Sequence, residues 1–312
     1  MNSTIRLGYF YQTLPLMAAQ RHGFYRRHGV EVREERVRSS TQQFEYLLDG
    51  RYDVVQTSPD NVANYRYNTG HALGDRIDVQ GFLGMDYGLN LALVARPGIR
   101  SARTLKAVAV DAPDSGFAYV AYAILERAGM KRGKHYDVVP VGGVSQRFQR
   151  LLSGDAGFDA TLLSGGFETR ATNSSCRILG RVREVADPYV GAWTAATGRW
   201  LSENGPQAAA FAAAYREATA WCFDPDNEEA CLAMLMETPD TSPSLAEQLY
   251  RIQLQDEVGN IPDADVVAEG VGNVLALRAR YGGFEQDVDP DLILRDGELY
   301  RLLPSLPSYD VS

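Results

Sequence analysis

The sequence predicts an α/β protein built from two similar lobes. A short pattern of helix, turn and strand occurs twice, over residues 44–58 and 148–164. Strand and helix signals alternate through the first 172 residues, which indicates mostly parallel sheets with helices on both faces. At 312 residues the chain is long enough for one large domain or two of medium size.

Each copy of the repeated pattern begins with Phe-x-x-Leu-Leu, whose apolar side chains share one face of a helix. A Gly then fits the left-handed residue that ends a helix, and an Asp opens a short apolar strand that ends at a Ser. We expect both Ser to lie at carboxyl strand ends facing one cleft, both Phe in separate lobe cores, and both Asp in structural roles at the opposite strand ends. The matched residues are Phe44 and Phe148, Gly50 and Gly154, Asp53 and Asp159, and Ser58 and Ser164.

The first lobe opens with three strands and the helices between them. Ser40 with Gln43 resembles a capping box. Ser58-Pro59-Asp60 combines an N-cap, a first-turn Pro and an acid at the positive end of the helix dipole. In order, the expected elements are strand Ile5–Tyr9, helix Leu14–His22, strand Val30–Val37, helix Ser40–Leu48, strand Val54–Gln56 and a helix from Ser58.

A second α/β set follows the break at Arg96-Pro97-Gly98, after which the chain becomes mainly helical. Pro residues in Asp224-Pro225, Thr238-Pro239 and Ile261-Pro262 punctuate the helices. Expected strands are Ile77–Met85, Asn90–Ala95, Lys106–Val110, Asp137–Val141, Ala160–Leu163 and Trp193–Thr197; expected helices are Ser115–Ala128, Ser145–Leu152, one from Phe167, and those at about 206–222, 227–237, 243–256 and 263–280.

Composition excludes several classes of partner. The formal charge of −9 and the absence of a Lys/Arg stripe argue against nucleic acid. No apolar run approaches the roughly 20 residues of a membrane span, so the protein is not expected to insert in a membrane. The three Cys have no metal spacing and are expected to be free buried thiols. The chain starts directly with a strand, so we expect a cytoplasmic protein if Met1 is the true start, or a periplasmic one if a leader was removed.

A series of short motifs resembles one known family. In chain order they are Leu7-Gly8-Tyr9, Ala18-Ala19-Gln20, Gly23-Phe24-Tyr25, Gly29-Val30-x-Val32, Asp49-Gly50-x-x-Asp53-Val54, Ile99 with Leu105-Lys106, and Gly154 with Asp159-Ala160. Together they resemble the nitrate/sulfonate/taurine and thiamine-precursor branch of the type 2 periplasmic binding proteins, over residues 5 to roughly 240. The resemblance implies two Rossmann-like lobes, joined by two crossover strands and closing on a ligand like a hinged clamp. It places lobe one at 1–93 plus 194–312 and lobe two at 94–193.

Ligands of open α/β sheets bind at the carboxyl ends of strands and at helix N-termini. This rule, with the aromatic residues near the expected cleft, selects the candidate ligand-binding residues Tyr9, Tyr11, Gln12, Thr13, Ser58, Asp60, Asp86, Tyr87, Asp114, Ser115, Gly116, Ser164, Gly165, Gly166 and Trp193. The Ser residues are expected to be N-caps in any case, which does not exclude a place at the site. For the glycines a tight turn is the alternative, and for the aromatic residues it is core packing. Arg66, Arg147 and Arg170 lie a turn or more into helices, which weakens the case for a strongly charged ligand.

Two functions remain open from the sequence. The first is a solute-binding protein that closes on a small organic ligand, aromatic or anionic, and delivers it to the permease of an ABC importer. The alternative is a cytoplasmic enzyme or ligand sensor on the same fold, of desulfinase, decarboxylase or thiamine-precursor-synthase type. No nucleophile, Cys/His cluster or metal spacing is legible, so no catalytic residue, cofactor or metal is expected, although Asp60, Asp86, Tyr87 and Asp114 could transfer protons if buried.

Overall fold

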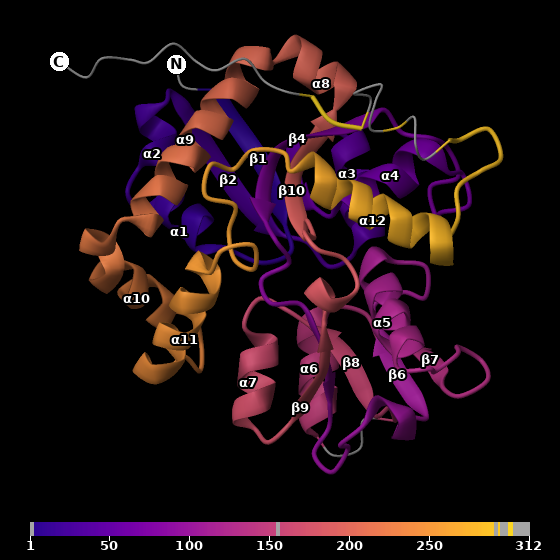
Figure 1. Cartoon of the computed structure of the whole chain (residues 1–312). Helices are drawn as coiled ribbons and strands as arrows, with labels where there is room; N and C mark the ends of the chain where they lie inside the picture. Colours follow the sequence, from indigo (N-terminus) through magenta and orange to yellow (C-terminus); the bar gives the residue numbers. More distant parts are fainter. Residues whose placement is uncertain (1–2, 154–156, 290–292, 294–298, 302–312) are drawn as a thin grey trace.

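The computed structural model describes residues 3–153, 157–289, 293 and 299–301, and it contains two five-stranded sheets. Each sheet forms the centre of one lobe, with helices on both faces, and the two lobes lie one above the other in Figure 1. Both sheets have the same strand order along the chain: second, first, third, a strand from a crossover segment, and fourth.

The sheet of lobe one has the order β2-β1-β3-β10-β4. β1, β2 and β3 are parallel, and β10 runs antiparallel to both of its neighbours. The carboxyl ends of the parallel strands therefore meet at one edge, which faces lobe two. The strands are β1 Ser3–Tyr9, β2 Val30–Arg36, β3 Val54–Thr57, β4 Val79–Asp86 and β10 Ala192–Thr197.

Lobe two repeats this arrangement with the order β7-β6-β8-β5-β9, in which β5 is the antiparallel strand. Its strands are β5 Ala92–Ala95, β6 Ala107–Val110, β7 Asp137–Pro140, β8 Ala160–Leu163 and β9 Arg177–Arg181. β5 pairs only within the second sheet and β10 only within the first. The lobe boundaries expected at 93/94 and 193/194 fall inside these two strands.

The helices follow the strands in alternation and then form a C-terminal group. The helices before the second crossover are α1 Leu14–Arg21, α2 Phe24–Arg27, α3 Ser40–Leu48, α4 Pro59–Tyr67, α5 Gly116–Arg127, α6 Val144–Leu152 and α7 Phe167–Asn173. Those after it are α8 Gly198–Glu203, α9 Gly205–Phe223, α10 Glu228–Met236, α11 Pro243–Leu254 and α12 Ala268–Tyr281. Figure 1 shows α9 and α10 beside lobe one, while α11 and α12 reach down to lobe two on opposite flanks.

Two α-helices and one strand among the described residues were not expected from the sequence. α2 is a single turn after Gly23, α8 directly follows β10, and β9 forms the edge of the second sheet. β9 alternates little and is only partly buried, so it lacks the apolar run that marks the other strands. The three Cys are free and buried, as expected.

The repeated pattern does mark equivalent units. β3 and β8 hold the same place in their sheets, and Ser58 and Ser164 follow these strands at the edges that face each other. Phe44 is fully buried in a core of lobe one, while Phe148 is partly buried against a separate core of lobe two. Gly50 has the left-handed conformation expected of it, with φ of 68°; Gly154 lies outside the described residues.

The two Asp of the repeat have the same structural role. Asp53 accepts hydrogen bonds from the Arg6 backbone at 2.8 Å and from the Arg6 guanidinium, inside β1. Asp159 accepts one from the Lys106 backbone at 2.6 Å, at the start of β6, and pairs with Arg96 at 2.9 Å. Each carboxylate thus ties the third strand of its sheet to the first, at the strand end away from the cleft.

Candidate functional site

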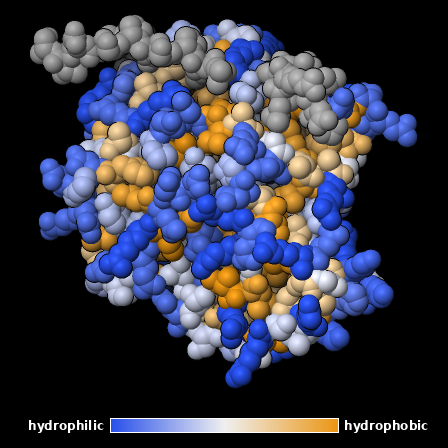
Figure 2. Space-filling model, viewed as in Figure 1, coloured by the Kyte–Doolittle hydropathy of each residue, from blue (hydrophilic) through white to orange (hydrophobic). Residues whose placement is uncertain are grey.

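The carboxyl ends of the two sheets face each other, and we call the junction between them the cleft. The loops after β1, β3 and β4 follow strand ends on the side of lobe one, and the loops after β6, β7 and β8 follow strand ends on the side of lobe two. In the space-filling view, hydrophilic residues gather across the middle of the visible face, at the level where the lobes meet (Figure 2). The first crossover runs through residues 87–91 and the second through 188–191.

The N-termini of α4 and α5 meet across the cleft. A Cβ atom at Gly116, the first residue of α5, would lie 2.6 Å from the Cβ of Asp60 in α4. Each helix is capped by its own N-cap residue, because Ser58 Oγ accepts from Asn61 N at 3.1 Å and Ser115 Oγ accepts from Ala118 N at 3.2 Å. Gly116 therefore allows the lobes to touch here. Both serines act as N-caps, which is the structural role expected of them from the sequence.

Asp60 is fully buried and belongs to an ion pair rather than to an open site. Both of its carboxylate oxygens accept hydrogen bonds from the Arg278 guanidinium of α12, each at 2.7 Å. Arg278 also donates to Asn64 Oδ1 at 2.9 Å, and its side chain is 3% exposed. Burial lowers the pKa of Arg278, but the Asp60 carboxylate outweighs this and raises it above its usual value.

Asp86 joins the two crossovers at the base of the cleft. Its carboxylate accepts from Tyr11 Oη at 2.7 Å, from Gly88 N at 2.8 Å and from the backbone of Ala192. Burial raises the pKa of Asp86 to about 6, although these three hydrogen bonds lower it in part. A Cβ atom at Gly191 would lie 2.5 Å from Asp86 Oδ1, so the carboxylate is enclosed by backbone. Asp86 thus connects the two crossover segments, and its carboxylate is enclosed by their backbone and by Tyr11.

The N-terminus of α6 differs from those of α4 and α5. Its N-cap residue is Gly143, which has no side chain to accept from the first amides of the helix. Gly143 is exposed, and a Cβ atom there would meet nothing within 4 Å. Gly142 has φ of 94°, a conformation that favours glycine, so the turn after β7 brings bare backbone to the cleft edge. The amides of the first turn have no acceptor within the helix.

Arg147 lies directly behind this turn and is 1% exposed. Its guanidinium donates to Gly142 O, after β7, and to Leu162 O of β8 at 3.2 Å. Its Nε is buried and has no hydrogen-bond partner among the described residues. Burial lowers the pKa of Arg147, and nearby Asp111 offsets this in part. Arg147 thus places a buried positive charge at the ends of two strands, with no ion pair to a described carboxylate.

Arg147 was not among the candidate residues, because these were chosen at the carboxyl ends of strands and at helix N-termini. Arg147 lies in the second turn of α6, beyond the loop that follows β7. A helical side chain points back toward the N-terminus, however, and Arg is long enough to reach the preceding loop. The signal available in the sequence was a long cation four residues after the Gly-Gly of a strand–helix turn.

The structure does not bring all candidate residues to one surface. Trp193 is fully buried in a core of lobe one, with an unpartnered Nε1, so it packs in the interior rather than lining the cleft. Thr13 is buried beside Tyr215 Oη at 3.5 Å, and Ser164 is also buried. Tyr9 ends β1, half-buried, and Gln12 is exposed and donates to Glu34 at 2.8 Å.

The remaining candidates lie at the rim. Asp114 is exposed, and its carbonyl accepts from Tyr119 Oη at 2.9 Å. Tyr87 lines a groove of about 550 Å³ on one flank of the cleft. Gly165 and Gly166 both have positive φ, 62° and 89°, and form the turn into α7, with Gly165 exposed at the cleft edge.

Two searches of the described residues bear on chemistry and location. No group of three or more His, Cys, Asp or Glu among them is arranged to hold a metal ion. Among the same residues, none of the helices has both the length and the apolar character that crossing a bilayer requires.

Comparison with solved structures identifies the fold. The periplasmic nitrate-binding protein NrtA of Synechocystis PCC 6803 is similar with a TM-score of 0.75 and 14% identity, over 94% of this chain and 85% of that one. The alkanesulfonate-binding protein SsuA of Xanthomonas axonopodis pv. citri, bound to MOPS, gives 0.70 and 13% over 96% of both chains. A Candida albicans gene product with the generic periplasmic binding protein fold gives 0.73 and 14% over 99% of both.

No protein-family model and no curated protein matches the sequence. The structural similarity covers nearly the whole chain. Within this chain, the sheets of the two lobes have the same strand order. The chain therefore has the periplasmic binding protein fold, and the resemblance noted in its sequence is confirmed at the level of the fold.

Proposed function

We propose that this protein is a solute-binding protein, which closes its two lobes on a small organic ligand and delivers it to an ABC importer. The similar protein NrtA is described as a periplasmic nitrate-binding protein and SsuA as an alkanesulfonate-binding protein, and their fold extends over this chain. The proposal places the protein in the periplasm, with the hinge in the crossovers at 87–91 and 188–191.

The observation that carries the proposal is the positive, uncapped end of α6. Backbone amides at a helix N-terminus bind anions, because their N–H groups and the helix dipole favour negative charge. Behind them, the Arg147 guanidinium is buried and forms no ion pair with a carboxylate in the part of the chain that the structure describes, and burial makes its interaction with a charge strong. We infer that an oxyanion of the ligand, such as a sulfonate or carboxylate, lies between Gly143 and Arg147.

Proton transfer is less well supported by the same geometry. Asp60 is neutralised by Arg278, and Asp86 is enclosed by Tyr11 and two backbone amides. Neither group can approach a ligand without breaking these bonds. The arrangement therefore supports binding and release of an unchanged ligand rather than its conversion.

The first test is native mass spectrometry of freshly purified protein, followed by titration with a panel of small sulfonates, carboxylates and nitrate. We expect a retained or added anion to bind with one-to-one stoichiometry and to be recovered unchanged. Binding of neutral isosteres with the same affinity would contradict the anionic site. Conversion of the ligand during prolonged incubation would favour the enzyme alternative.

The second test assigns Arg147. Arg147→Gln should weaken anion binding roughly 100-fold, because a buried charge partner contributes about 2–5 kcal/mol. Arg147→Lys keeps the charge but not the planar guanidinium, so its anion affinity should lie between those of the wild type and Arg147→Gln. Arg150→Gln, one turn along the same helix and exposed, is the matched control and should bind as the wild type does.

A further inference from the structure

The two flanks of the cleft are built differently, and the first is closed by α12. Val271 and Leu275 of this helix pack in a core of lobe one, whereas Val274 and Leu277 pack in the core of lobe two. α12 lies against both α4 and α5 (Figure 1). One helix thus contributes to the interior of both lobes, as a third connection beside the two crossovers.

Polar and aromatic contacts reinforce this flank, which we call the α5–α12 seam. Arg278 carries the Asp60 ion pair, and its guanidinium lies 5.3 Å from the centre of the Tyr119 ring. Tyr281 packs against the rings of Tyr119 and Tyr122 at 6.3 and 6.0 Å. Separating α5 from α12 would expose these rings and the apolar side chains beneath them.

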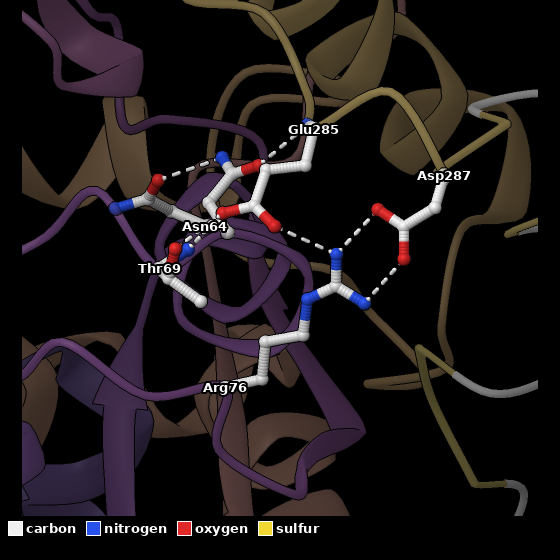
Figure 3. A network of polar contacts seen from close by, with 6 residues as sticks. Asn64, Thr69, Arg76, Glu285 and Asp287 are labelled. Carbon is white, nitrogen blue, oxygen red and sulfur yellow. Dashed lines mark hydrogen bonds and ion pairs between the residues drawn. The ribbon is translucent and has the colours of Figure 1, made fainter.

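α12 itself is held to lobe one at both ends. Before the helix, Asn260 forms an isolated bridge with Asp86 at the end of β4. After it, Arg76 of lobe one binds Glu285 and Asp287 at 2.8 and 2.6 Å, and Thr69 donates to Glu285 at 2.7 Å. Figure 3 shows Arg76 pointing between the two carboxylates. The helix therefore stays with lobe one if the lobes move.

The opposite flank, the α7–α11 seam, is mainly polar. Arg170 of α7 donates to Asp240 O at 2.8 Å and to Thr241 Oγ1 at 2.7 Å. Asn173 reaches Gln248 at 3.5 Å, and Leu249 of α11 contacts Gly166. Beside these contacts lies the groove of about 550 Å³, bounded by α7, β9, α11 and the first crossover. Exposed polar contacts such as these add little stability, because water replaces them when they break.

We propose that the lobes do not open symmetrically: the α5–α12 seam is the pivot, and the α7–α11 seam is the gate through which the ligand enters. Opening at the gate breaks a few hydrogen bonds that water can satisfy. Opening at the pivot would expose the aromatic cluster and would uncover the Asp60–Arg278 ion pair, which lies within lobe one beneath Gly116 of α5. The inference rests on the proposed function only in requiring that the lobes move.

Spin-label distance measurements on the full chain test this directly, without any ligand. One pair of nitroxides on Ser175→Cys and Glu229→Cys flanks the gate, and another on Lys131→Cys and Gln286→Cys flanks the pivot; all four positions are exposed. Unsubstituted protein, labelled in parallel, controls for the buried native thiols. We expect a broad or two-peaked distance distribution for the gate pair and a single narrow one for the pivot pair.

Adding Arg170→Gln to both pairs should shift the gate distribution toward long distances and leave the pivot distribution unchanged. A pivot distribution as broad as that of the gate, or two narrow distributions, would overturn the inference. The outcome is independent of the binding assay. A chain that pivots as described but binds no anion would refute the proposed ligand and support the pivot. A chain that binds an anion but opens equally on both flanks would support the proposed ligand and refute the pivot.

Discussion

The two lobes share one topology but use their helix N-termini at the cleft in opposite ways. In lobe one, α4 is capped by Ser58, and its buried acid is neutralised by Arg278 from a distant helix. In lobe two, α6 begins at a glycine without a side-chain cap, and the buried Arg147 has no carboxylate partner among the described residues. Helix N-termini at the same cleft can thus serve stability in one lobe and remain available for a ligand in the other, although α4 and α6 follow different strands of their sheets.

The largest expected effect comes from comparing the two buried arginines. Arg278→Met leaves the Asp60 carboxylate buried without its partner, so we expect a loss of about 3–5 kcal/mol of unfolding free energy. Arg147→Met leaves only two carbonyl groups with one fewer donor, and should cost about 2 kcal/mol or less. Urea unfolding of both variants measures the difference.

The double variant Asp60→Asn/Arg278→Met is the control for that comparison. It removes the charge that Arg278→Met leaves behind, and should recover much of the lost stability. Equal losses for Arg278→Met and Arg147→Met would show that the two lobes do not differ in this respect.

A smaller effect on stability is expected at the glycines that lie at the N-termini of α5 and α6. Gly116→Ala places a methyl group against Asp60 and should cost about 1–3 kcal/mol, since the lobes are in contact there. It should also increase the radius of gyration in small-angle scattering, because the lobes are pushed apart. Gly143→Ala meets nothing within 4 Å and is expected to stay within about 0.5 kcal/mol of the wild type. An unchanged radius and stability for Gly116→Ala would argue that the lobes are apart in solution.

Asp86 accepts hydrogen bonds from Gly88 at the first crossover and from Ala192 at the end of the second. Its titration should make the free energy of unfolding depend on pH. Its pKa is raised to about 6 in the folded protein, so the native state binds this proton more tightly than the unfolded chain does. The protonated Asp86 carboxyl therefore stabilises the folded state. This stabilisation is fully present below the pKa that Asp86 has in the unfolded chain, and it is lost as the pH rises through about 6. Relative to Asp86→Asn, the wild type should gain about 1 kcal/mol between pH 7 and pH 5. A constant difference between the two proteins over this range would contradict the raised pKa.

The smallest effect on stability is expected from giving α6 the cap that α4 has. Gly143 has φ of −59° and ψ of 159°, which a serine adopts without strain. Gly143→Ser should therefore add only a few tenths of a kcal/mol. If the free amides bind the ligand, the same variant should weaken anion binding, as measured by calorimetry with the sulfonate and carboxylate panel. An unchanged anion affinity of Gly143→Ser would show that the anion does not bind at the N-terminus of α6.

Much of the fold could be predicted because its signals are local. The helical face of Phe-x-x-Leu-Leu, the Gly that ends a helix and the Ser that begins the next one are each specified within a few residues. Asp53 and Asp159 were assigned to structure correctly because a strand's start and end follow from its direction. β9 was missed because its edge position leaves it only partly buried, without the apolar run of a central strand.

The site was less predictable, because its geometry depends on contacts between distant segments. Ser58, Gly116 and Gly165 lie at the cleft edge, where the strand-end rule placed them. Trp193 was expected there as well, but alternation along β10 directs it into the core. That Asp60 is paired depends on Arg278, 218 residues away.

The sequence alone determined the α/β class, the repeated unit and the strand ends that form the cleft, because periodicity, capping and turn residues act over short distances. It also predicted strands at Asn90–Ala95 and Trp193–Thr197, whose role as crossovers came from the family resemblance. Only the tertiary structure decided which charged groups are neutralised and which stay available. Packing placed α12 in both cores, paired Arg278 with Asp60 and left Arg147 without an ion pair to any described carboxylate. These outcomes depend on which side chains meet across the lobes, and no local pattern carries that information.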